Sequence, residues 1–272
     1  MKLTNQIELI DCIAGMKQID ANTIDICVTS PPYNLNINYG SYNDNKPRES
    51  YLLWINDIFI ELKRILKPDG HLFLNMGYSN IDPWIGIDVA NIIRNNFILQ
   101  NNITWIKSIY VDGKTSGHFK PINSKRFSNP TWEHLFHFTK SGMVEIDKLA
   151  VGVPYEWKSN IERFDQDGDL RCRGNSWFIP YETIANRKKH RGNHPATFPT
   201  KLVEMCIKFS GVKNGILIDP FMGSGTSAIA AINCGIDYCG FEIDQEYLDF
   251  ANDRISYHMT TMQNRLDITD SS

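Results

Sequence analysis

The sequence predicts an α/β fold, an open sheet with helices on both faces. Short apolar runs rich in β-branched residues, at 24–28 and 215–218, are typical of buried strands. Longer stretches with helical periodicity, such as 48–66 and 200–210, separate them. A glycine-rich segment follows the strand at 215–218, and open α/β sheets bind ligands at the carboxyl ends of their strands. With 272 residues, 42% of them hydrophobic, the chain can form one full core with an insertion.

The expected elements fall into two blocks separated by a segment without sustained periodicity. In the first block we expect strands at 6–11, 24–28, 71–75, 102–106 and 132–139, and helices at 48–66 and 85–95. In the second we expect helices at 200–210 and from 228, strands at 215–218 and 238–242, and a frayed tail at 267–272. The core domain is therefore expected to comprise 1–143 and 193–272, with an inserted region at 144–192.

A six-residue segment, Thr29-Ser30-Pro31-Pro32-Tyr33-Asn34, follows the strand at 24–28. Two successive prolines fix φ and remove two N–H donors, which leaves stiff carbonyl groups that only accept hydrogen bonds. The serine adds another oxygen, and the tyrosine adds a face on which a base can stack, a contact worth roughly 1–3 kcal/mol. A lone Pro-Pro pair is more often a structural turn, but six such residues after a strand favour a site for the amino group of an exposed nucleobase.

The segment Asp219-Pro220-Phe221-Met222-Gly223-Ser224-Gly225-Thr226 joins a predicted strand to a predicted helix. Its glycines let backbone N–H groups approach a ligand, and the helix N-terminus favours a negative group. Glu242 ends the next strand about twenty residues later. In nucleotide-binding α/β folds an acid at this position binds ribose hydroxyls. The glycine spacing is not the dinucleotide fingerprint, and Thr226 stands where a P-loop needs lysine. We therefore expect a nucleoside ligand other than NAD or ATP.

The two motifs, in this order, resemble those of amino-group DNA methyltransferases that use S-adenosylmethionine, and specifically the circularly permuted β group. Other family features occur at Ile10-Asp11-Cys12, 66–70, 133–136 and 194–199, so the resemblance covers most of the chain. It implies a Rossmann-like methyltransferase sheet with permuted motif order. The core domain would then be catalytic, and the inserted region at 144–192 would recognise the target.

The resemblance also implies roles for individual residues. The target amine would be held by Ser30, Pro31, Pro32 and Tyr33. The cofactor would be bound by Asp11, Phe198, Thr200, Asp219, Phe221, Gly223, Ser224, Gly225, Thr226 and Glu242. Serine before Pro-Pro is commoner in family members that modify cytosine, so we expect transfer to cytosine N4 in duplex DNA after base flipping. The alternatives are adenine N6 with the same mechanism, and a nucleic-acid-binding protein without turnover.

The formal net charge of −3 gives no global attraction to DNA, so contacts with phosphate must be local. Basic residues cluster at 105–130 and at 187–191. Charge runs are usually solvated loops, but beside a base-binding motif they favour phosphate contact. The predicted DNA contacts are Lys114, Lys120, Lys125, Arg126, Arg187, Lys188, Lys189 and Arg191.

Further classes of protein are disfavoured. None of the six cysteines follows a proline, unlike the nucleophile of carbon-5 cytosine methyltransferases. The acidic run at 165–169 resembles a calcium loop, but Ser176 stands where the twelfth-position glutamate is needed, so no metal is expected. Without a long apolar run or a signal-like start, we expect a cytoplasmic protein. The expected partners are double-stranded DNA and a cognate restriction endonuclease, and the expected state is a monomer or homodimer.

Overall fold

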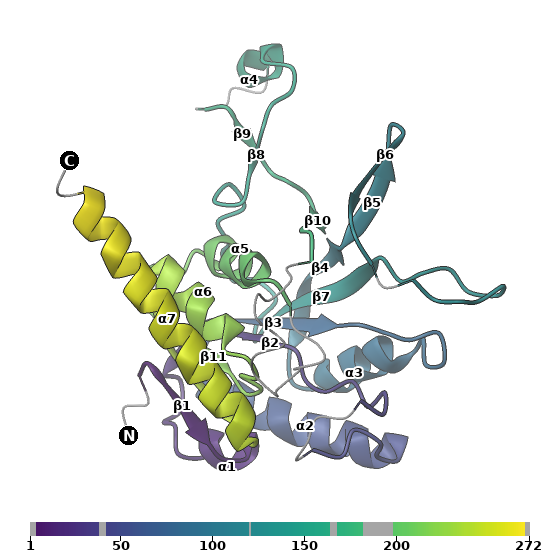
Figure 1. Ribbon diagram of the computed structural model, residues 1–272, viewed down its shortest axis with the longest axis vertical. Coiled ribbons are helices and arrows are strands. Elements are labelled where there is room, and N and C mark those ends of the chain that lie inside the picture. Colours follow the sequence, from purple (N-terminus) through teal and green to yellow (C-terminus); the bar gives the residue numbers. More distant parts are fainter. Residues whose placement is uncertain (1–3, 38–41, 120, 164–167, 182–197, 270–272) are drawn as a thin grey trace.

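A computed structural model describes residues 4–37, 42–119, 121–163, 168–181 and 198–269 of the chain (Figure 1). Eight strands form one mixed sheet. Their order is β1 (Gln6–Leu9), β12 (Asp237–Glu242), β11 (Ile216–Asp219), β2 (Ile24–Thr29), β3 (Leu66–Met76), β7 (Trp132–Thr139), β4 (Ile98–Ile106) and β10 (Ser176–Phe178). Within this sheet β7 alone is antiparallel to its neighbours. The predicted α/β class is confirmed.

Helices cover both faces of the sheet (Figure 1). One face carries α1 (Cys12–Met16), α2 (Arg48–Ile65) and α3 (Ile85–Ile93), and the other carries α5 (Thr200–Ser210), α6 (Thr226–Cys234) and α7 (Gln245–Thr269). Strand β2 shows why most of its residues are apolar: Ile24 and Cys27 pack in the core on the α2 side, whereas Ile26 and Val28 pack in the core on the α5 side. No helix in the described ranges is long and apolar enough to cross a membrane.

Three local expectations differ from the structure. Strand β3 already begins at Leu66, five residues before its expected start, and it is irregular over these residues, because Ile24 pairs with Leu66 but Ile26 pairs with His71. The expected basic loop contains a hairpin, β5 (Ser108–Val111) and β6 (Lys114–Gly117). Helix α7 continues to Thr269, so the tail expected to fray from 267 is helical over its first three residues.

The hairpin has a local cause. Asp112 and Gly113 both have positive φ, 50° and 78°, the conformation that a two-residue hairpin turn requires. Glycine adopts this conformation without cost, and aspartate tolerates it better than most residues.

The region at 144–192 is divided between a projecting part and the main sheet. Strands β8 (Val153–Pro154) and β9 (Leu170–Arg171) pair with each other and, with α4 (Ser159–Arg163), extend away from the body (Figure 1). Strand β10 instead pairs with the edge of β4, and Trp177 is fully buried in the core beneath α5. The inserted region therefore contributes one strand to the main sheet.

Candidate active site

The two predicted motifs meet at the centre of the sheet. Strands β2 and β11 are hydrogen-bonded neighbours, although the chain between them runs through most of the molecule. The helix after β11 packs on one face, whereas the helix that follows β2 packs on the other. A crevice opens where the chain leaves adjacent parallel strands towards opposite faces, and ligands bind there in open α/β sheets. A pocket occupies this place.

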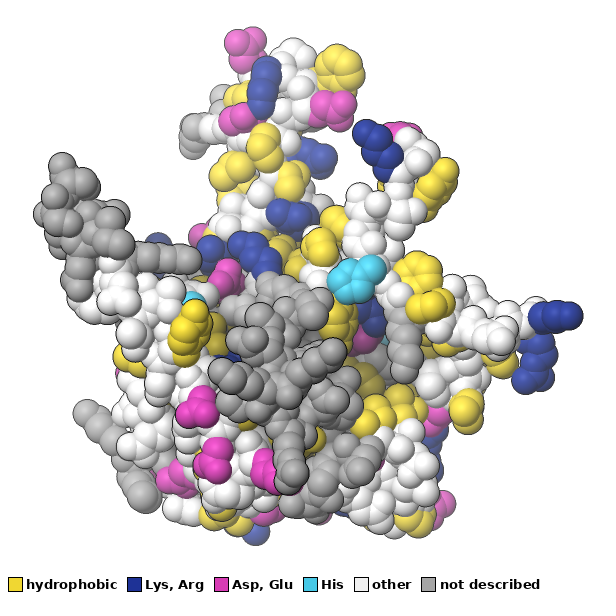
Figure 2. Space-filling view, in the orientation of Figure 1, with side chains coloured by type: hydrophobic (Ala, Val, Ile, Leu, Met, Phe, Trp, Pro, Cys, Tyr) yellow, Lys and Arg dark blue, Asp and Glu magenta, His cyan; other side chains and the backbone are white. Residues whose placement is uncertain are grey.

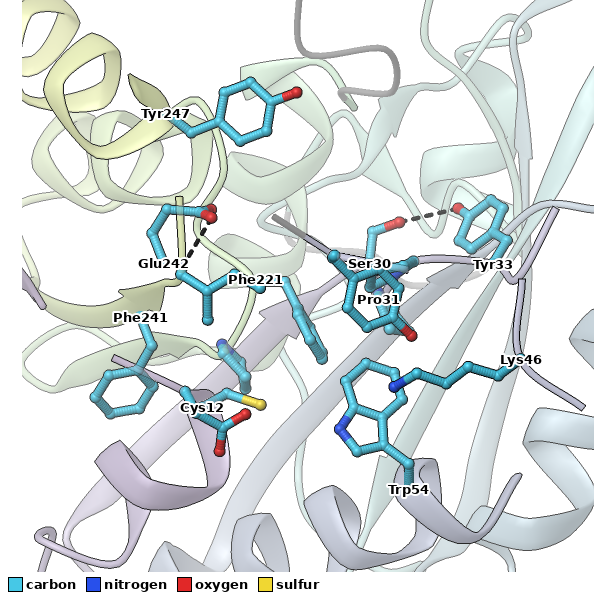
Figure 3. Close-up of a pocket in the computed structure, with 15 residues that line it drawn as sticks. Cys12, Ser30, Pro31, Tyr33, Lys46, Trp54, Phe221, Phe241, Glu242 and Tyr247 are labelled. Carbon is cyan, nitrogen blue, oxygen red and sulfur yellow. Dashed lines mark hydrogen bonds between the residues drawn. The ribbon is translucent and has the colours of Figure 1, made fainter. Parts of the chain in front are cut away.

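Seven predicted site residues line the pocket, namely Asp11, Ser30, Pro31, Pro32, Tyr33, Phe221 and Glu242. Glu242 and Ser30 lie on opposite sides of the Phe221 ring (Figure 3). The pocket therefore has a carboxylate at one end, an aromatic wall in the middle and the Ser-Pro-Pro acceptors at the other end.

The Asp219 carboxylate connects the two motifs by hydrogen bonds. Its Oδ1 accepts hydrogen bonds from Thr29 Oγ1 at 2.7 Å and from the Phe221 amide at 3.0 Å, and its Oδ2 accepts one from Ser227 Oγ at 2.5 Å. The side chain is only 1% exposed, and this burial raises the pKa of the carboxyl to about 6 despite the three hydrogen bonds. Asp219 does not line the pocket; it positions residues that do.

The Ser-Pro-Pro-Tyr segment is fixed by neighbouring polar groups. Ser30 Oγ and Tyr33 Oη are 2.9 Å apart, and Tyr51 Oη on α2 donates to the Pro32 carbonyl oxygen at 2.7 Å. Ser30 and Pro31 both line the pocket, and the Pro31 carbonyl receives no hydrogen bond from the described residues. Each of these two adjacent residues carries an acceptor oxygen.

Two described segments beyond Tyr33, 34–37 and 44–46, are hydrogen-bonded to each other. The buried Asp44 carboxylate accepts hydrogen bonds from the amides of Asn34, Leu35 and Ile37 at 2.8 to 3.0 Å. The Asn34 side chain pairs with the backbone of Lys46 in both directions, at 2.7 and 2.8 Å. These bonds fix the position of Lys46, which lines the pocket.

The glycine-rich segment connects with the carboxylate at the other end of the pocket. The Gly223 amide donates to Glu242 Oε2 at 2.9 Å, and the amides of Ile243 and Asp244 donate to Oε1 at 2.9 and 3.0 Å. Burial raises the pKa of Glu242. A carboxylate offers about four lone-pair sites, so Glu242 can still accept hydrogen bonds from a ligand hydroxyl. Gly225 begins α6 with a φ of 76°.

An aromatic wall was not predicted from the sequence. Trp54 on α2 meets the Phe221 ring edge-on at 5.6 Å, and Lys46 Nζ lies 4.5 Å from the Trp54 ring centroid and 4.6 Å from that of Tyr42. All four side chains line the pocket. Trp54 lies three residues after the buried Tyr51 on α2, a helical spacing that could have indicated a place on the core side.

No role was predicted from the sequence for Glu133, whose carboxylate contacts Tyr33. Glu133, at the start of β7, has Oε2 3.3 Å from Tyr33 Oη, and Asn75 Nδ2 donates to the same oxygen at 3.1 Å. Lys107 Nζ lies 2.8 Å from the other oxygen, Oε1. The sequence carries no spacing signal for this cluster, because its members come from four separate segments of the chain.

The remaining predicted cofactor residues do not line the pocket. Ser224 and Thr226 are buried at the start of α6, where their hydroxyls are 3.3 Å apart. Phe198 packs against the core on the α5 side, and Thr200 begins α5. Asp11 lines the pocket but also caps α1, because its Oδ1 accepts from the amides of Ile13 and Ala14. These placements leave the cofactor roles as predictions.

Three of the predicted DNA contacts lie in the described residues. Lys114 is exposed on the β5–β6 hairpin, and Lys125 and Arg126 are exposed on the loop before β7. Figure 2 shows Lys and Arg side chains both at the ends of projecting arms and near the base of the upper arm. The other five predicted contacts, Lys120, Arg187, Lys188, Lys189 and Arg191, lie outside the described residues.

Comparison with known proteins gives concordant results. A family model described as DNA methylase, for N6 and N4 methylation, matches residues 24–253. Type II methyltransferase M.BglII of Bacillus subtilis is 28% identical over 262 residues, which cover 91% of this chain and 68% of that protein. Among solved structures, the cytosine-N4-specific PvuII DNA methyltransferase superposes with a TM-score of 0.69 at 18% identity, covering 91% of this chain and 84% of that one. M1.HpyAVI in complex with SAM superposes with a TM-score of 0.55 at 23% identity, covering 92% and 98%.

Proposed function

This chain belongs to the family of N6 and N4 DNA methylases, and from that premise we propose that it methylates cytosine N4 within a specific DNA sequence. It is an S-adenosylmethionine-dependent DNA methyltransferase of the restriction-modification type. The choice of base, the site residues and the mechanism are our proposal. The observation that carries it is the meeting, across β2 and β11, of an amine-accepting wall and a nucleoside-type pocket.

The pocket residues fit S-adenosylmethionine. The half-buried Glu242 carboxylate is placed to accept hydrogen bonds from ribose hydroxyls, and Phe221 and Trp54 offer flat apolar surfaces to the adenine ring. Beside the pocket, Gly240 lets the loop after β11 lie close to β12, because an added Cβ would be 2.7 Å from the Asp219 carbonyl oxygen. When bound, the cofactor supplies an electrophilic methyl group on a positively charged sulfur.

The chain's own residues activate the amine. An exocyclic amino nitrogen is a poor nucleophile because its lone pair is delocalised into the ring. Ser30 Oγ and the Pro31 carbonyl, from two adjacent lining residues, would accept hydrogen bonds from its two N–H groups and draw the nitrogen out of the plane of the ring. Ser30 and Pro31 would thereby present a nucleophilic lone pair to the methyl group that the bound cofactor would supply; the sulfur would leave as a neutral thioether, and the nitrogen would release one proton to solvent. The acceptor dipoles stabilise the positive charge that develops on nitrogen.

The target base must leave the duplex to reach this wall, at a cost of a few kcal/mol. The half-buried Tyr33 ring lines the pocket beside Ser30 and would offset part of this cost by stacking on the base. The exposed Lys114, Lys125 and Arg126 would contact phosphates, and the inserted region would read the recognition sequence. A cognate restriction endonuclease would cleave the same sequence when it is unmethylated.

Two observations support cytosine. Serine precedes Pro-Pro, as is commoner in the cytosine-specific members that the sequence resembles, and the N4-specific PvuII enzyme shares the fold over 91% of this chain. The chemistry of the wall alone suits adenine N6 equally, because both bases present two N–H groups to the acceptors.

The test is to express the chain in a host that lacks DNA methylation, digest the genomic DNA to nucleosides and quantify both methylated bases by mass spectrometry. N4-methylcytosine is expected. N6-methyladenine would overturn the choice of base but preserve the enzyme class. If a folded protein that binds S-adenosylmethionine yields neither methylated base, the proposed function is contradicted.

Ser30→Ala tests the proposed wall. The variant removes one of the two acceptors, so turnover should fall by about 10²-fold or more, while the affinity for S-adenosylmethionine changes little. Ser256→Ala, on the exposed surface of α7, is the matched control. Turnover of Ser30→Ala close to that of the control would refute the role of Ser30.

A further inference from the structure

The carboxylate of Glu133 is the end point of a hydrogen-bond chain that begins at the pocket wall. Ser30 Oγ is 2.9 Å from Tyr33 Oη, which in turn is 3.3 Å from Glu133 Oε2. Strand β7 is antiparallel to β3, so its first residues lie at the sheet edge where β3 ends and where the catalytic motif is found. The chain therefore joins three side chains from two distant parts of the sequence.

The environment of Glu133 makes it an acceptor. Lys107 Nζ lies 2.8 Å from Oε1, and the ion pair is largely enclosed, with the two side chains only 14% and 16% exposed. On the other oxygen, Asn75 Nδ2 donates at 3.1 Å; the same amide nitrogen donates to the His134 carbonyl at 3.0 Å, which fixes its orientation. An ammonium group and an amide N–H thus face a carboxylate, and an ionised carboxylate only accepts hydrogen bonds.

This acceptor sets the direction of the whole chain. Tyr33 has one hydroxyl hydrogen, and the charged Glu133 oxygen is the strongest acceptor near it; the Asn75 carbonyl oxygen, at 3.4 Å, is neutral and more distant. With its hydrogen directed to Glu133, Tyr33 Oη must accept the hydrogen of Ser30. The lone pairs of Ser30 Oγ are then left facing the pocket.

We propose that Glu133 is a positioning residue that, through Tyr33, keeps Ser30 oriented as a hydrogen-bond acceptor for the substrate amine. The inference rests on the proposed function of the Ser-Pro-Pro wall. In the reverse orientation Tyr33 would donate to Ser30, and the Ser30 hydrogen would point at an N–H group of the base. Two donors that face each other form no hydrogen bond, so the nitrogen would not be activated. The direction of the hydrogen bonds from Ser30 to Glu133 therefore decides whether Ser30 can accept from the amine.

Glu133→Gln tests the polarity with little change of shape. The glutamine amide can donate to Tyr33 Oη and thereby reverse the chain. We expect turnover at saturating DNA and S-adenosylmethionine to fall by about tenfold or more, with the affinity for both changed by less than about twofold. Glu145→Gln, on the exposed surface, is the matched control and should retain normal turnover.

A double-mutant cycle with Tyr33→Phe separates this role from a general structural one. Phenylalanine keeps the ring but removes the hydroxyl through which Glu133 acts. Tyr33→Phe should lower turnover, and adding Glu133→Gln to it should then have little further effect. Equal losses from Glu133→Gln in both backgrounds would overturn the proposal, as would unchanged turnover of Glu133→Gln alone.

Tyr33→Phe alone keeps the proposal testable if Glu133→Gln does not fold, which thermal unfolding would show. The isosteric ring preserves packing, so full turnover of this variant would show that the chain has no effect and would overturn the inference. If the proposed function is wrong, the unmodified protein methylates neither base. If only the role of Glu133 is wrong, the unmodified protein is active and the variants retain its turnover.

Discussion

Asp219→Asn should change how the stability of the protein depends on pH while preserving the contacts at the centre of the site. The asparagine oxygen can replace Oδ1 and accept from Thr29 and the Phe221 amide. Its NH₂ group then faces Ser227, whose hydroxyl can rotate to accept. All three hydrogen bonds are retained, and only the ionisable group is lost.

The magnitude follows from the raised pKa of Asp219. Burial moves the pKa of the carboxyl from its ordinary 3.8 to about 6, a shift of about 2.2 pH units. At 1.36 kcal/mol per unit this shift corresponds to about 3 kcal/mol. Because the folded pKa is raised, protonated Asp219 favours the folded state below pH 3.8, and this stability is lost as the pH rises through 6. The asparagine variant does not have this dependence.

The assay is urea unfolding of both proteins between pH 4 and pH 8, followed by tryptophan fluorescence. The free energy of unfolding of Asp219→Asn, minus that of the unmodified protein, should increase by about 2 to 3 kcal/mol from pH 4 to pH 7, with about half of the change above pH 5. A difference that does not vary with pH would refute the reasoning. Asp219→Ala is the contrast: it leaves three donors without an acceptor and should cost at least about 3 kcal/mol at every pH.

Two further outcomes are expected. Burial lowers the pKa of His71 to about 4 and that of His137 to about 3, so their neutral forms stabilise the fold above pH 6.5 and this stability is lost as the pH falls towards 4. His137→Phe should therefore flatten the fall in unfolding free energy between pH 6.5 and pH 4.5, and parallel curves for the two proteins would contradict this. Gly240→Ala would place a Cβ 2.2 Å from Met222 Cε and 2.7 Å from the Asp219 carbonyl oxygen. The resulting displacement should cost about 1–3 kcal/mol of stability in urea unfolding, and an unchanged free energy of unfolding would contradict the close approach of the loop after β11 to β12.

The buried parallel strands could be predicted from the sequence because both of their faces are apolar. Residues 24–28 and 215–218 are mainly apolar runs, and each leads directly into a motif, so the position of the motifs at one sheet edge followed from the strand pattern alone. The Asp112-Gly113 hairpin also had a recognisable turn signal, although the segment was interpreted as a loop.

The polar cluster around Glu133 could not be predicted in the same way. Its contact with Tyr33 depends on the register between β3 and β7, which places Asn75 opposite Leu135 and so brings Glu133 near the strand end. Strand β10 has only three residues, too few for a periodic signal. Motif matching likewise does not separate residues that touch a ligand from those that support the loop, as the buried Ser224 shows.

The pairing of β2 with β11 also has a consequence for how the protein is made. The hydrogen bond between Thr29 and Asp219 joins residues 190 positions apart, so the centre of the sheet cannot close until strands from both ends of the chain are present. Contacts of such long sequence separation slow folding. During synthesis the segment at 29–34 is made well before β11, the strand with which β2 pairs. The pocket can therefore assemble only after β11 has left the ribosome.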